Sequence, residues 1–447
     1  MTTASHQIVH VLDHLVKVAP VGTNRALLQL MWAMVSGAFL HSRGAVHSAL
    51  LQAGFAAGEI RRSWQALRYG VWHSDELLAR WRNWVKAETD WQPNRYAGWQ
   101  PLAIDITGFW RPRLHGWVGR CYHQLAQRLL PSVTFAVVVQ VGQVGTQRLP
   151  LLRKLLRGGN EAGTEAALKE KMLSWARRHL GPKEVLVCDA GVKVQQMQAA
   201  GVARFVLRLA RNCTARRNEL PPQSGRGRPR EYGQSLRPLA RTYDGHRRPA
   251  STPDVCCRFR QDSVTINVHG WRQVVRSDQK VSQTNATFTI WVYFDPRFQQ
   301  PLLLATNLDA DAATVFRLYC DRWPVEQVPL VAKQLLGLQR HFVFAPASTW
   351  RLPELALLMG NILTVMATVL PPLPSGYWDR HPKKRQDDCD ALSNGRLFQI
   401  LTPFRSEFGK KRRERTTCRR ELRRIDECRR WFRPNTALLE SNYGPHC

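Results

Sequence analysis

Two short apolar runs, each ending in an aspartate, constrain the fold of this chain more than any other feature. Residues 101–105 (PLAID) and 185–189 (VLVCD) have the length and composition of buried strands. An amphipathic helix is predicted between them at 165–180, and β-branched runs at 134–141 and 205–208 predict further strands. Strands that alternate with a helix favour an α/β layer with its functional groups at the strand ends.

The regions on either side of this layer differ in character. Apolar residues recur at helical spacing up to about residue 95, and two helices are predicted around Gly54, at 47–51 and 57–67. This pair is compatible with a helix-turn-helix DNA reader, and a plain helix pair fits equally well. The Trp-rich stretch 81–99 is interpreted as a connector. Further strands are predicted at 257–260, 263–269, 287–294 and 301–307, and an apolar helix at 352–370.

The charge of the chain points to a polyanionic partner. Its 447 residues suffice for two or three domains, and 65 Lys and Arg against 34 acidic residues give a formal charge of +31. Nucleic acid is the first candidate and an anionic membrane the second. No signal peptide and no bilayer-spanning run is found, since the best candidate, 355–370, is short and contains Asn361. The ten cysteines show no CxxC or zinc-ligand spacing, which indicates reduced thiols in a cytosolic protein.

Four residues able to act on a phosphate lie between 319 and 333. Tyr319, Arg322, Glu326 and Lys333 are three, four and seven residues apart, a spacing that would place them on one face of an α-helix. Pro324 suits a first helical turn, so we expect a break near Arg322 and a helix that starts at Pro324. Taken alone, the motif is also compatible with a surface Arg322–Glu326 ion pair.

Three carboxylates form a candidate metal site. Asp105 and Asp189 end predicted strands and Glu326 lies on the later helix. Such hard oxygen ligands suit Mg²⁺ or Mn²⁺, and two ions about 3.5–4 Å apart can activate a water and stabilise the leaving oxygen of a phosphodiester. Each aspartate alone could equally be a helix cap or turn former.

The joint pattern resembles the RNase H-like DDE transposases. Tyr-x2-Arg-x3-Glu-x6-Lys is the signature of a large group of bacterial insertion-sequence transposases, and this chain matches each of its positions. The tryptophan after the arginine, the Asp-x-Thr-Gly turn at 105–108, the Asp-Ala-Gly turn at 189–191 and a strand ending in Arg208 are also similar to that group. Pro329 departs from the pattern, because it falls where a helix interior is expected.

The resemblance, which covers about residues 95–370, implies both fold and activity. It implies an α/β, RNase H-like catalytic domain at 96–212 and 300–372, interrupted at 213–299 by a basic loop and a β-rich insertion domain. A helical DNA-binding domain at 1–95 and a basic C-terminal region at 373–447, for DNA contact or oligomerisation, complete the expected layout. The implied function is Mg²⁺-dependent cutting and joining of insertion-sequence DNA, with Mn²⁺ as a possible substitute, by a homodimer in the bacterial cytoplasm at the nucleoid.

Several residues are candidates for DNA contact. Tyr319, Arg322 and Lys333 would hold phosphates near the metals, with Arg208 beside them. Residues 225–229 (GRGRP) resemble an AT-hook, with a solvated basic loop as the alternative. One of two tryptophans could hold an unstacked base, although core packing is the better expectation. The arginines of this basic loop are Arg226, Arg228 and Arg230, and the two tryptophans are Trp271 and Trp291.

Two other functions fit parts of the sequence. A metal-dependent nuclease of the same fold would cut DNA without joining it. A domesticated, transposase-derived DNA-binding protein would do neither, but such a binder has no need for three convergent carboxylates.

Overall fold

The computed structural model describes residues 3–370 except 112–113, 124–125, 223–224, 226–227 and 340. Arg226 and the region 373–447 therefore lie outside the described residues. The chain forms two compact units. Within the described range, unit 1 comprises residues 3–188, 200–203 and 321–370, and unit 2 comprises 189–199 and 204–320.

Unit 1 begins with helices, as the apolar spacing predicts. Ile8, Val11, Leu12 and Leu15 are almost fully buried, because they share one face of the first helix. The helices are α1 (Thr3–Val16), α2 (Thr23–Val35), α3 (Ala38–His41), α4 (Val46–Gln52), α5 (Ala57–Tyr69) and α6 (Ser74–Glu88). The connector predicted at 81–99 is wrong for its first half, which is part of α6. Trp81 continues the buried face of that helix and is 0% exposed.

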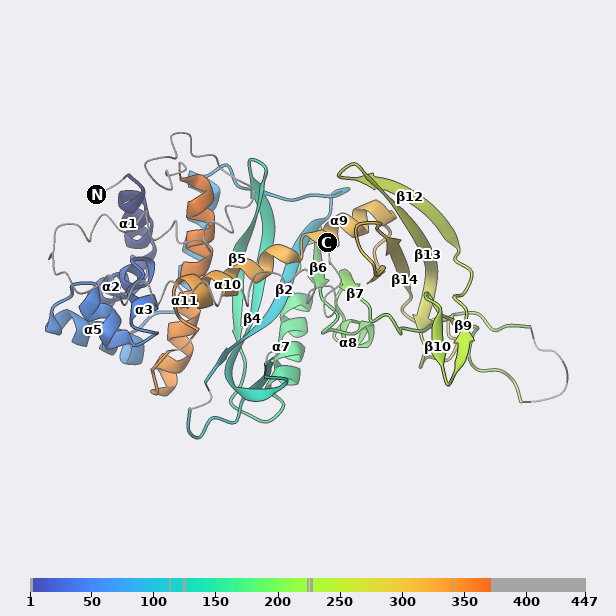
Figure 1. The fold of residues 1–447 in the computed structure, drawn as a ribbon, viewed down its shortest axis with the longest axis horizontal. Helices are drawn as coiled ribbons and strands as arrows, with labels where there is room; N and C mark the ends of the chain where they lie inside the picture. Colours follow the sequence, from blue (N-terminus) through green and yellow to red (C-terminus); the bar gives the residue numbers. More distant parts are fainter. Residues whose placement is uncertain are drawn as a thin grey trace. The chain divides into compact units, whose positions relative to one another are not determined.

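Helix α11 (Pro346–Val369) is the central helix of unit 1. It contacts α2, α5 and α6 on one side and β4 and β5 on the other (Figure 1). Asn361 fixes this contact, because its Oδ1 accepts hydrogen bonds from Trp81 Nε1 and Leu152 N, both 2.9 Å away. This helix is long and apolar enough to cross a membrane, but 89% of its apolar window is buried inside the protein. The prediction of a buried helix is confirmed.

A mixed sheet lies against these helices. Its strands are β1 (Gln92–Pro93), β2 (Gln100–Trp110), β3 (Arg120–His123), β4 (Arg128–Val144), β5 (Gln147–Arg157) and β6 (Glu184–Cys188). β4 pairs antiparallel with β2 on one edge and with β5 on the other, and β2 pairs parallel with β6. Helix α7 (Thr164–His179) precedes β6. The chain is thus a mixed α/β protein, and the predictions at 134–141, 165–180 and 185–189 are confirmed.

The position of Asp105 differs from the sequence prediction. β2 does not end at Asp105 but continues to Trp110, and Asp105 lies opposite Val137 of β4. The turn expected at 105–108 is therefore wrong, because Ile106, Thr107 and Phe109 suit a strand and β4 extends far enough to pair with them. On its other edge, β2 pairs with β6 only as far as Ala103, opposite Val187.

Unit 2 is built on an antiparallel sheet. Four of its strands follow the order β7-β15-β14-β13. Strands β12 and β8 also pair with β13, and β9 pairs with β8. The strands are β7 (Phe205–Arg208), β8 (Ala215–Arg217), β9 (Ser235–Leu236), β12 (Val255–Gln261), β13 (Val264–Arg276), β14 (Phe288–Phe294) and β15 (Leu302–Thr306). A separate hairpin joins β10 (Arg241–Tyr243) and β11 (His246–Arg248). The predicted strands at 205–208, 257–260, 263–269, 287–294 and 301–307 are confirmed.

Two helices complete unit 2. α8 (Val194–Ala199) follows Asp189, and α9 (Ala312–Cys320) carries Tyr319. Asp311 caps α9 as predicted, since its Oδ1 lies 2.6 Å from the backbone nitrogen of Thr314.

The compact units do not follow the domain boundaries expected from the sequence. In unit 1, one continuous apolar core includes the N-terminal helices, the sheet and α11. The chain passes from unit 2 to unit 1 between Cys320 and Asp321, inside the motif that was expected to form one helix face.

Candidate active site

Lys333 lies over the strand that carries Asp105. Its Nζ donates a 2.7 Å hydrogen bond to Thr107 Oγ1 and lies 4.8 Å from the centre of the Trp110 ring. Burial lowers the pKa of Lys333 from its usual 10.5 to about 8, and the negative charge of Asp105 opposes this shift. Asp105 itself accepts a 2.8 Å hydrogen bond from the backbone nitrogen of Ile106. The structure thus brings one predicted phosphate-holding cation and one predicted metal ligand to the same strand of unit 1.

Arg322 and Glu326 form an ion pair. Arg322 Nη1 lies 2.7 Å from Glu326 Oε1, with 8% of the arginine side chain and 38% of the glutamate side chain exposed. Glu326 ends a 3₁₀ turn, η1 (Trp323–Glu326), that contacts β2, β4 and β5. The helix start predicted at Pro324 is confirmed to within one residue. The pair expected for the purely structural interpretation therefore exists, but on an element that packs against the strand of Asp105.

The segment from Glu326 to Lys333 changes helix type twice. The 3₁₀ turn is followed by α10 (Gln327–Leu330) and by a π turn, η2 (Val331–Leu335). Pro329 cannot donate the hydrogen bond that an α-helix interior requires, and Leu336 N bonds Val331 O, five residues back. π turns often occur at functional sites. The departure noted at Pro329 is therefore accommodated by a wider helix, which carries Lys333.

Helix α11 supports this segment from behind. Gly360 lies so close to it that an added Cβ would be 2.7 Å from Val328 O and 3.1 Å from Ala332 N. A glycine is needed for such an approach, because the neighbouring atoms belong to the backbone. The buried core helix thus fixes the position of the residues between Glu326 and Lys333.

In unit 2, Asp189 lies beside two of the predicted DNA-contacting residues. Tyr319 donates a 3.2 Å hydrogen bond to Asp189 Oδ1, and Arg208 Nη1 is 3.7 Å from the same oxygen. These three residues come from α9, from the turn after β6 and from β7. The tyrosine and the arginine therefore have a direct partner in the acid that follows β6.

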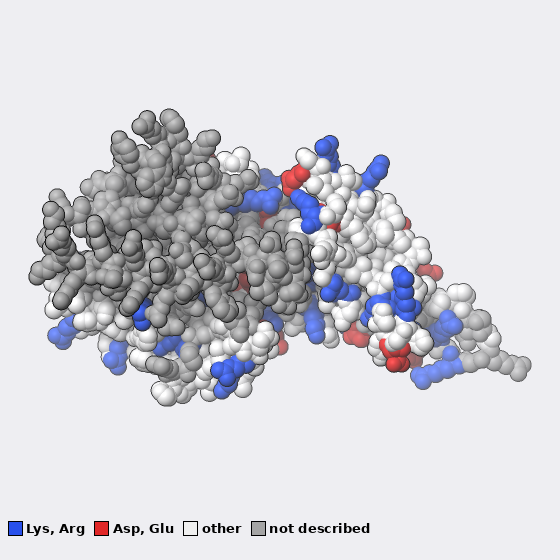
Figure 2. Space-filling view, viewed as in Figure 1, with Lys and Arg blue, Asp and Glu red and all other residues white. Residues whose placement is uncertain are grey.

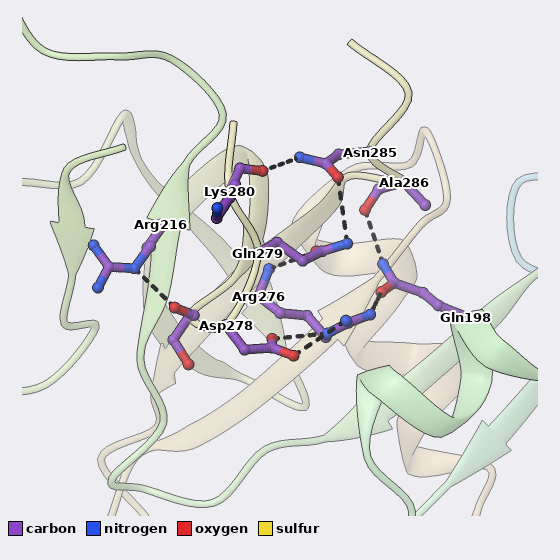
Figure 3. A network of polar contacts seen from close by, with 9 residues as sticks. Gln198, Arg216, Arg276, Asp278, Gln279, Lys280, Asn285 and Ala286 are labelled. Atoms are coloured by element: carbon purple, nitrogen blue, oxygen red, sulfur yellow. Dashed lines mark hydrogen bonds and ion pairs between the residues drawn. The ribbon is translucent and has the colours of Figure 1, made fainter. Parts of the chain in front are cut away.

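A polar network holds the helix that follows Asp189 (Figure 3). Gln198 of α8 accepts a 2.7 Å hydrogen bond from Arg276 Nη1 and donates one of 2.8 Å to Ala286 O. Arg276 also binds Asp278, and Asn285 Nδ2 donates to Lys280 O. The loop between β13 and β14 is thereby tied to α8.

The remaining candidate DNA contacts are dispersed or buried. Arg228 and Arg230 are exposed in the loop before β9, and Arg228 lies 3.4 Å from Glu231. Trp271 and Trp291 are 1% and 2% exposed in the sheet of unit 2. This burial favours the core-packing interpretation, because a stacked base needs an accessible ring. Basic side chains are nevertheless spread over the visible face of unit 2, among fewer acidic ones (Figure 2).

The N-terminal helix pair presents a basic stripe. α4 and α5 flank residues 53–56, in which Gly54 adopts a φ of +86°, a conformation that favours glycine in a tight turn. Both helices match the prediction. One face of α5 is buried on unit 1, and its opposite face exposes Arg61, Arg62, Gln65 and Arg68. This arrangement suits a recognition helix, whose side chains must reach base edges and phosphates.

The carboxylates of unit 1 fit a hard metal ion only together with further ligands. Among the described residues, no group of three or more His, Cys, Asp or Glu side chains is placed to hold a metal. Asp105 and Glu326 nevertheless lie on elements that touch each other, β2 and η1. Mg²⁺ usually takes one or two carboxylates together with waters and substrate phosphates. Two carboxylates, completed by DNA phosphates, are compatible with that preference.

The sequence analysis missed several residues that hold these groups. Thr107 receives the Lys333 hydrogen bond, and Asp321 is fully buried beside Arg322, with Asn94 and Tyr96 as partners. The carboxylate of Asp321 inside the motif was a usable signal. Thr107 belongs to the Asp-x-Thr-Gly motif at 105–108, whereas Asn94 and Tyr96 carry no sequence signal, because only the fold brings them to Asp321.

No family model matches the chain, and no curated protein is similar to it. The resemblance to DDE transposases therefore rests on the signature residues.

Proposed function

We propose that this protein is a DDE transposase, which cuts DNA at the ends of an insertion sequence and joins those ends to target DNA. One observation carries the proposal: the segment of Glu326 and Lys333 packs on β2, the strand of Asp105. If the residue spacing matched the signature only by chance, there would be no reason to expect this packing. The distribution of acids, one on a strand, one after a later strand and one on a helix, agrees with the resemblance.

The register of the sheet supports the choice of the two aspartates. Ala103 of β2 lies opposite Val187 of β6. Asp105 and Asp189 each follow this pair by two residues along their own segment of the chain. We propose that both acids, with Glu326, form the catalytic carboxylate set.

The cations of the site have distinct roles in this proposal. Lys333, oriented by Thr107, would place a point charge against a DNA phosphate, and Arg322 would hold a phosphate through its planar fork. Arg322 binds Glu326 in the structure described here, so a phosphate that takes the guanidinium would release the carboxylate. Tyr319 and Arg208 would orient Asp189. A bound Mg²⁺ or Mn²⁺ would activate water and stabilise developing charge on phosphate oxygens.

The setting of the reaction is proposed from charge and resemblance together. The excess of Lys and Arg suits a protein that binds DNA, and the proposed partners are the transposon ends, the target DNA and a second copy of the chain. The proposed location is the bacterial cytoplasm, at the nucleoid. The α5 stripe and the exposed Arg228 and Arg230 are proposed to contact DNA outside the catalytic carboxylates.

The experiment uses a plasmid that carries the DNA flanking the coding region. The full chain is incubated with this plasmid and Mg²⁺, and both cleavage and joined products are measured. Asp105→Asn, Asp189→Asn and Glu326→Gln should each abolish cleavage while DNA affinity without metal stays within about two-fold, because a metal ligand contributes little to phosphate binding. Asp13→Asn, which removes an exposed acid paired with Lys17, is the control and should cut normally.

The outcomes separate the three functions. Cleavage with joined products supports a transposase, and cleavage without them supports a nuclease of the same fold. Metal-independent binding without cleavage by the unmodified chain would leave a DNA-binding protein. Normal cleavage by any one of the three variants would remove that acid from the site.

A further inference from the structure

A buried carboxylate begins the segment that carries Arg322 and Glu326. Asp321 is 0% exposed, and its Oδ2 accepts hydrogen bonds from Asn94 Nδ2 at 2.7 Å and from Tyr96 OH at 3.0 Å. Its Oδ1 lies 3.6 Å from Arg148 Nη1, a half-exposed guanidinium. Three side chains from two other parts of unit 1 thus converge on one residue.

The partners of Asp321 belong to the chain that leads into β2. Asn94 N bonds Val141 O of β4, and β1, directly before it, also pairs with β4. Tyr96 and Trp99 exchange backbone hydrogen bonds of 2.9 Å around a tight turn, and β2 starts at the next residue, Gln100. The turn is therefore fixed to the sheet at the start of the strand that carries Asp105.

We propose that Asp321 is a positioning residue, which fixes the Arg322–Glu326 segment to the turn at 94–99 and so sets Glu326 relative to Asp105. This inference rests on the proposed function. Asp321 touches neither DNA nor metal in it, and acts through the turn and through the residues that follow it in the chain.

The cost of burying Asp321 supports a positioning role. A carboxylate without a close bidentate partner loses hydration that a 3.6 Å ion pair restores only in part. Glu354 of α11 provides the contrast, because both of its oxygens bind Arg157 at 2.7 Å. Directional bonds to Asn94 and Tyr96 fix where the segment starts, which an apolar side chain of the same size would not do.

The test compares two site variants with a matched control in the full-length protein. Asp321→Ala removes the carboxylate, and Tyr96→Phe removes one hydrogen bond with little change of shape. Glu354→Gln, the control, alters another buried carboxylate of unit 1 that lies outside the proposed site. Tyr96→Phe keeps the test valid if Asp321→Ala fails to fold.

Two readouts are needed, one of them independent of activity. Hydrogen exchange without metal should rise at 91–99 and at 321–327 in Tyr96→Phe and Asp321→Ala, and stay unchanged there in Glu354→Gln. With Mg²⁺, cleavage per folded molecule should fall about 3- to 10-fold in Tyr96→Phe and more in Asp321→Ala, because misplaced reacting groups cost large factors. The Mg²⁺ concentration for half-maximal cleavage should rise in both variants, and the double variant should be no worse than Asp321→Ala.

Two results would overturn the inference. One is unchanged exchange at both segments, and the other is a cleavage loss that merely follows the unfolded fraction with an unchanged Mg²⁺ requirement. Failure of the proposed function looks different: the unmodified chain would then not cut DNA, or Asp105→Asn would cut it normally, while hydrogen exchange at the two segments would still rise in the Asp321 and Tyr96 variants.

Discussion

Arg322 Nη1 and Glu326 Oε1 lie 2.7 Å apart, but the arginine side chain is 8% exposed and the glutamate side chain 38%. Pairs of this spacing on an exposed helix contribute about 0.3–0.5 kcal/mol. Glu326→Ala takes the carboxylate from a buried guanidinium, so we expect a loss of about 1 kcal/mol in the free energy of unfolding without metal. Urea denaturation measures this loss. Asp13→Ala breaks the exposed Lys17 pair and should cost less than half as much; equal losses would show that burial of Arg322 is irrelevant.

Replacement of Lys333 should separate stability from activity. The pKa of Lys333 is lowered to about 8, so the charged form that prevails at neutral pH is disfavoured by folding. Lys333→Met should therefore raise the free energy of unfolding by about 1 kcal/mol at pH 7, while cleavage is lost. The difference from wild type should shrink as pH rises from about 8 to 10.5. Lys86→Met, at an exposed position of α6, is the control. A Lys333→Met protein that is less stable than wild type would contradict the expectation.

His341 should make unit 1 sensitive to acid. It is 1% exposed, and burial followed by the charge of Arg111 lowers its pKa to about 3, against a smaller opposing effect of a hydrogen bond with the Leu338 backbone. The neutral form favours folding, so its contribution is complete above about pH 6.5 and falls as the pH drops from there toward 3. At pH 5 the loss is about 2 kcal/mol.

Thermal unfolding at pH 7 and pH 5 tests this sensitivity. His341→Leu should lose less stability between the two pH values than wild type does. His47→Gln, a change at an exposed histidine, should behave as wild type. An equal pH effect in all three proteins would exclude His341 as the cause.

Asn361 should be essential for the contact between α11 and the sheet. Its side chain accepts from Trp81 and Leu152 and donates to Pro150 O at 2.6 Å. Asn361→Leu leaves buried donors without an acceptor, at about 1–3 kcal/mol for each such group. Chemical denaturation should show a loss of about 3 kcal/mol. Thr364→Val removes one local hydrogen bond to Gly360 O and should cost clearly less.

The α5 stripe should determine how the chain recognises DNA. Arg62→Gln and Arg68→Gln should weaken binding on all sequences and flatten its salt dependence, because phosphate contacts release counterions. Gln65→Ala should instead change the sequence preference, if the side chain reads a base edge. Gel shifts on the flanking DNA and on random DNA measure both effects. Lys17→Gln, at the exposed residue directly after α1, is the control. Unchanged binding by all the α5 variants would leave α4 and α5 as a plain helix pair.

The sequence predicted elements well where a local pattern determines them. Helices with a periodic apolar face and strands such as Phe205–Arg208 were found because side-chain spacing alone specifies them. β5 was missed because Arg153 and Lys154 interrupt its apolar pattern, which becomes intelligible only once β4 lies beside it. Trp81 was assigned to a connector because Asn361, the residue to which it hydrogen-bonds, is far away in sequence.

The candidate site was predictable in composition but not in geometry. Counting residues found Glu326 and Lys333, but it could not show that Lys333 bonds Thr107 or that Asp105 lies within a strand. The role proposed for Asp321 could not be predicted from spacing either, because its partners Asn94 and Tyr96 lie more than two hundred residues away in sequence. Such contacts depend on tertiary packing, which no local spacing records.

The π turn at Val331–Leu335 changes the direction in which the side chains of the motif point. A π turn accommodates one residue more than an α turn, so everything after it is rotated relative to a regular helix. Deleting a single residue there would restore ordinary helical geometry and yet turn Lys333 away from Thr107. The seven-residue interval from Glu326 to Lys333 therefore directs Lys333 towards Thr107 only together with this irregularity.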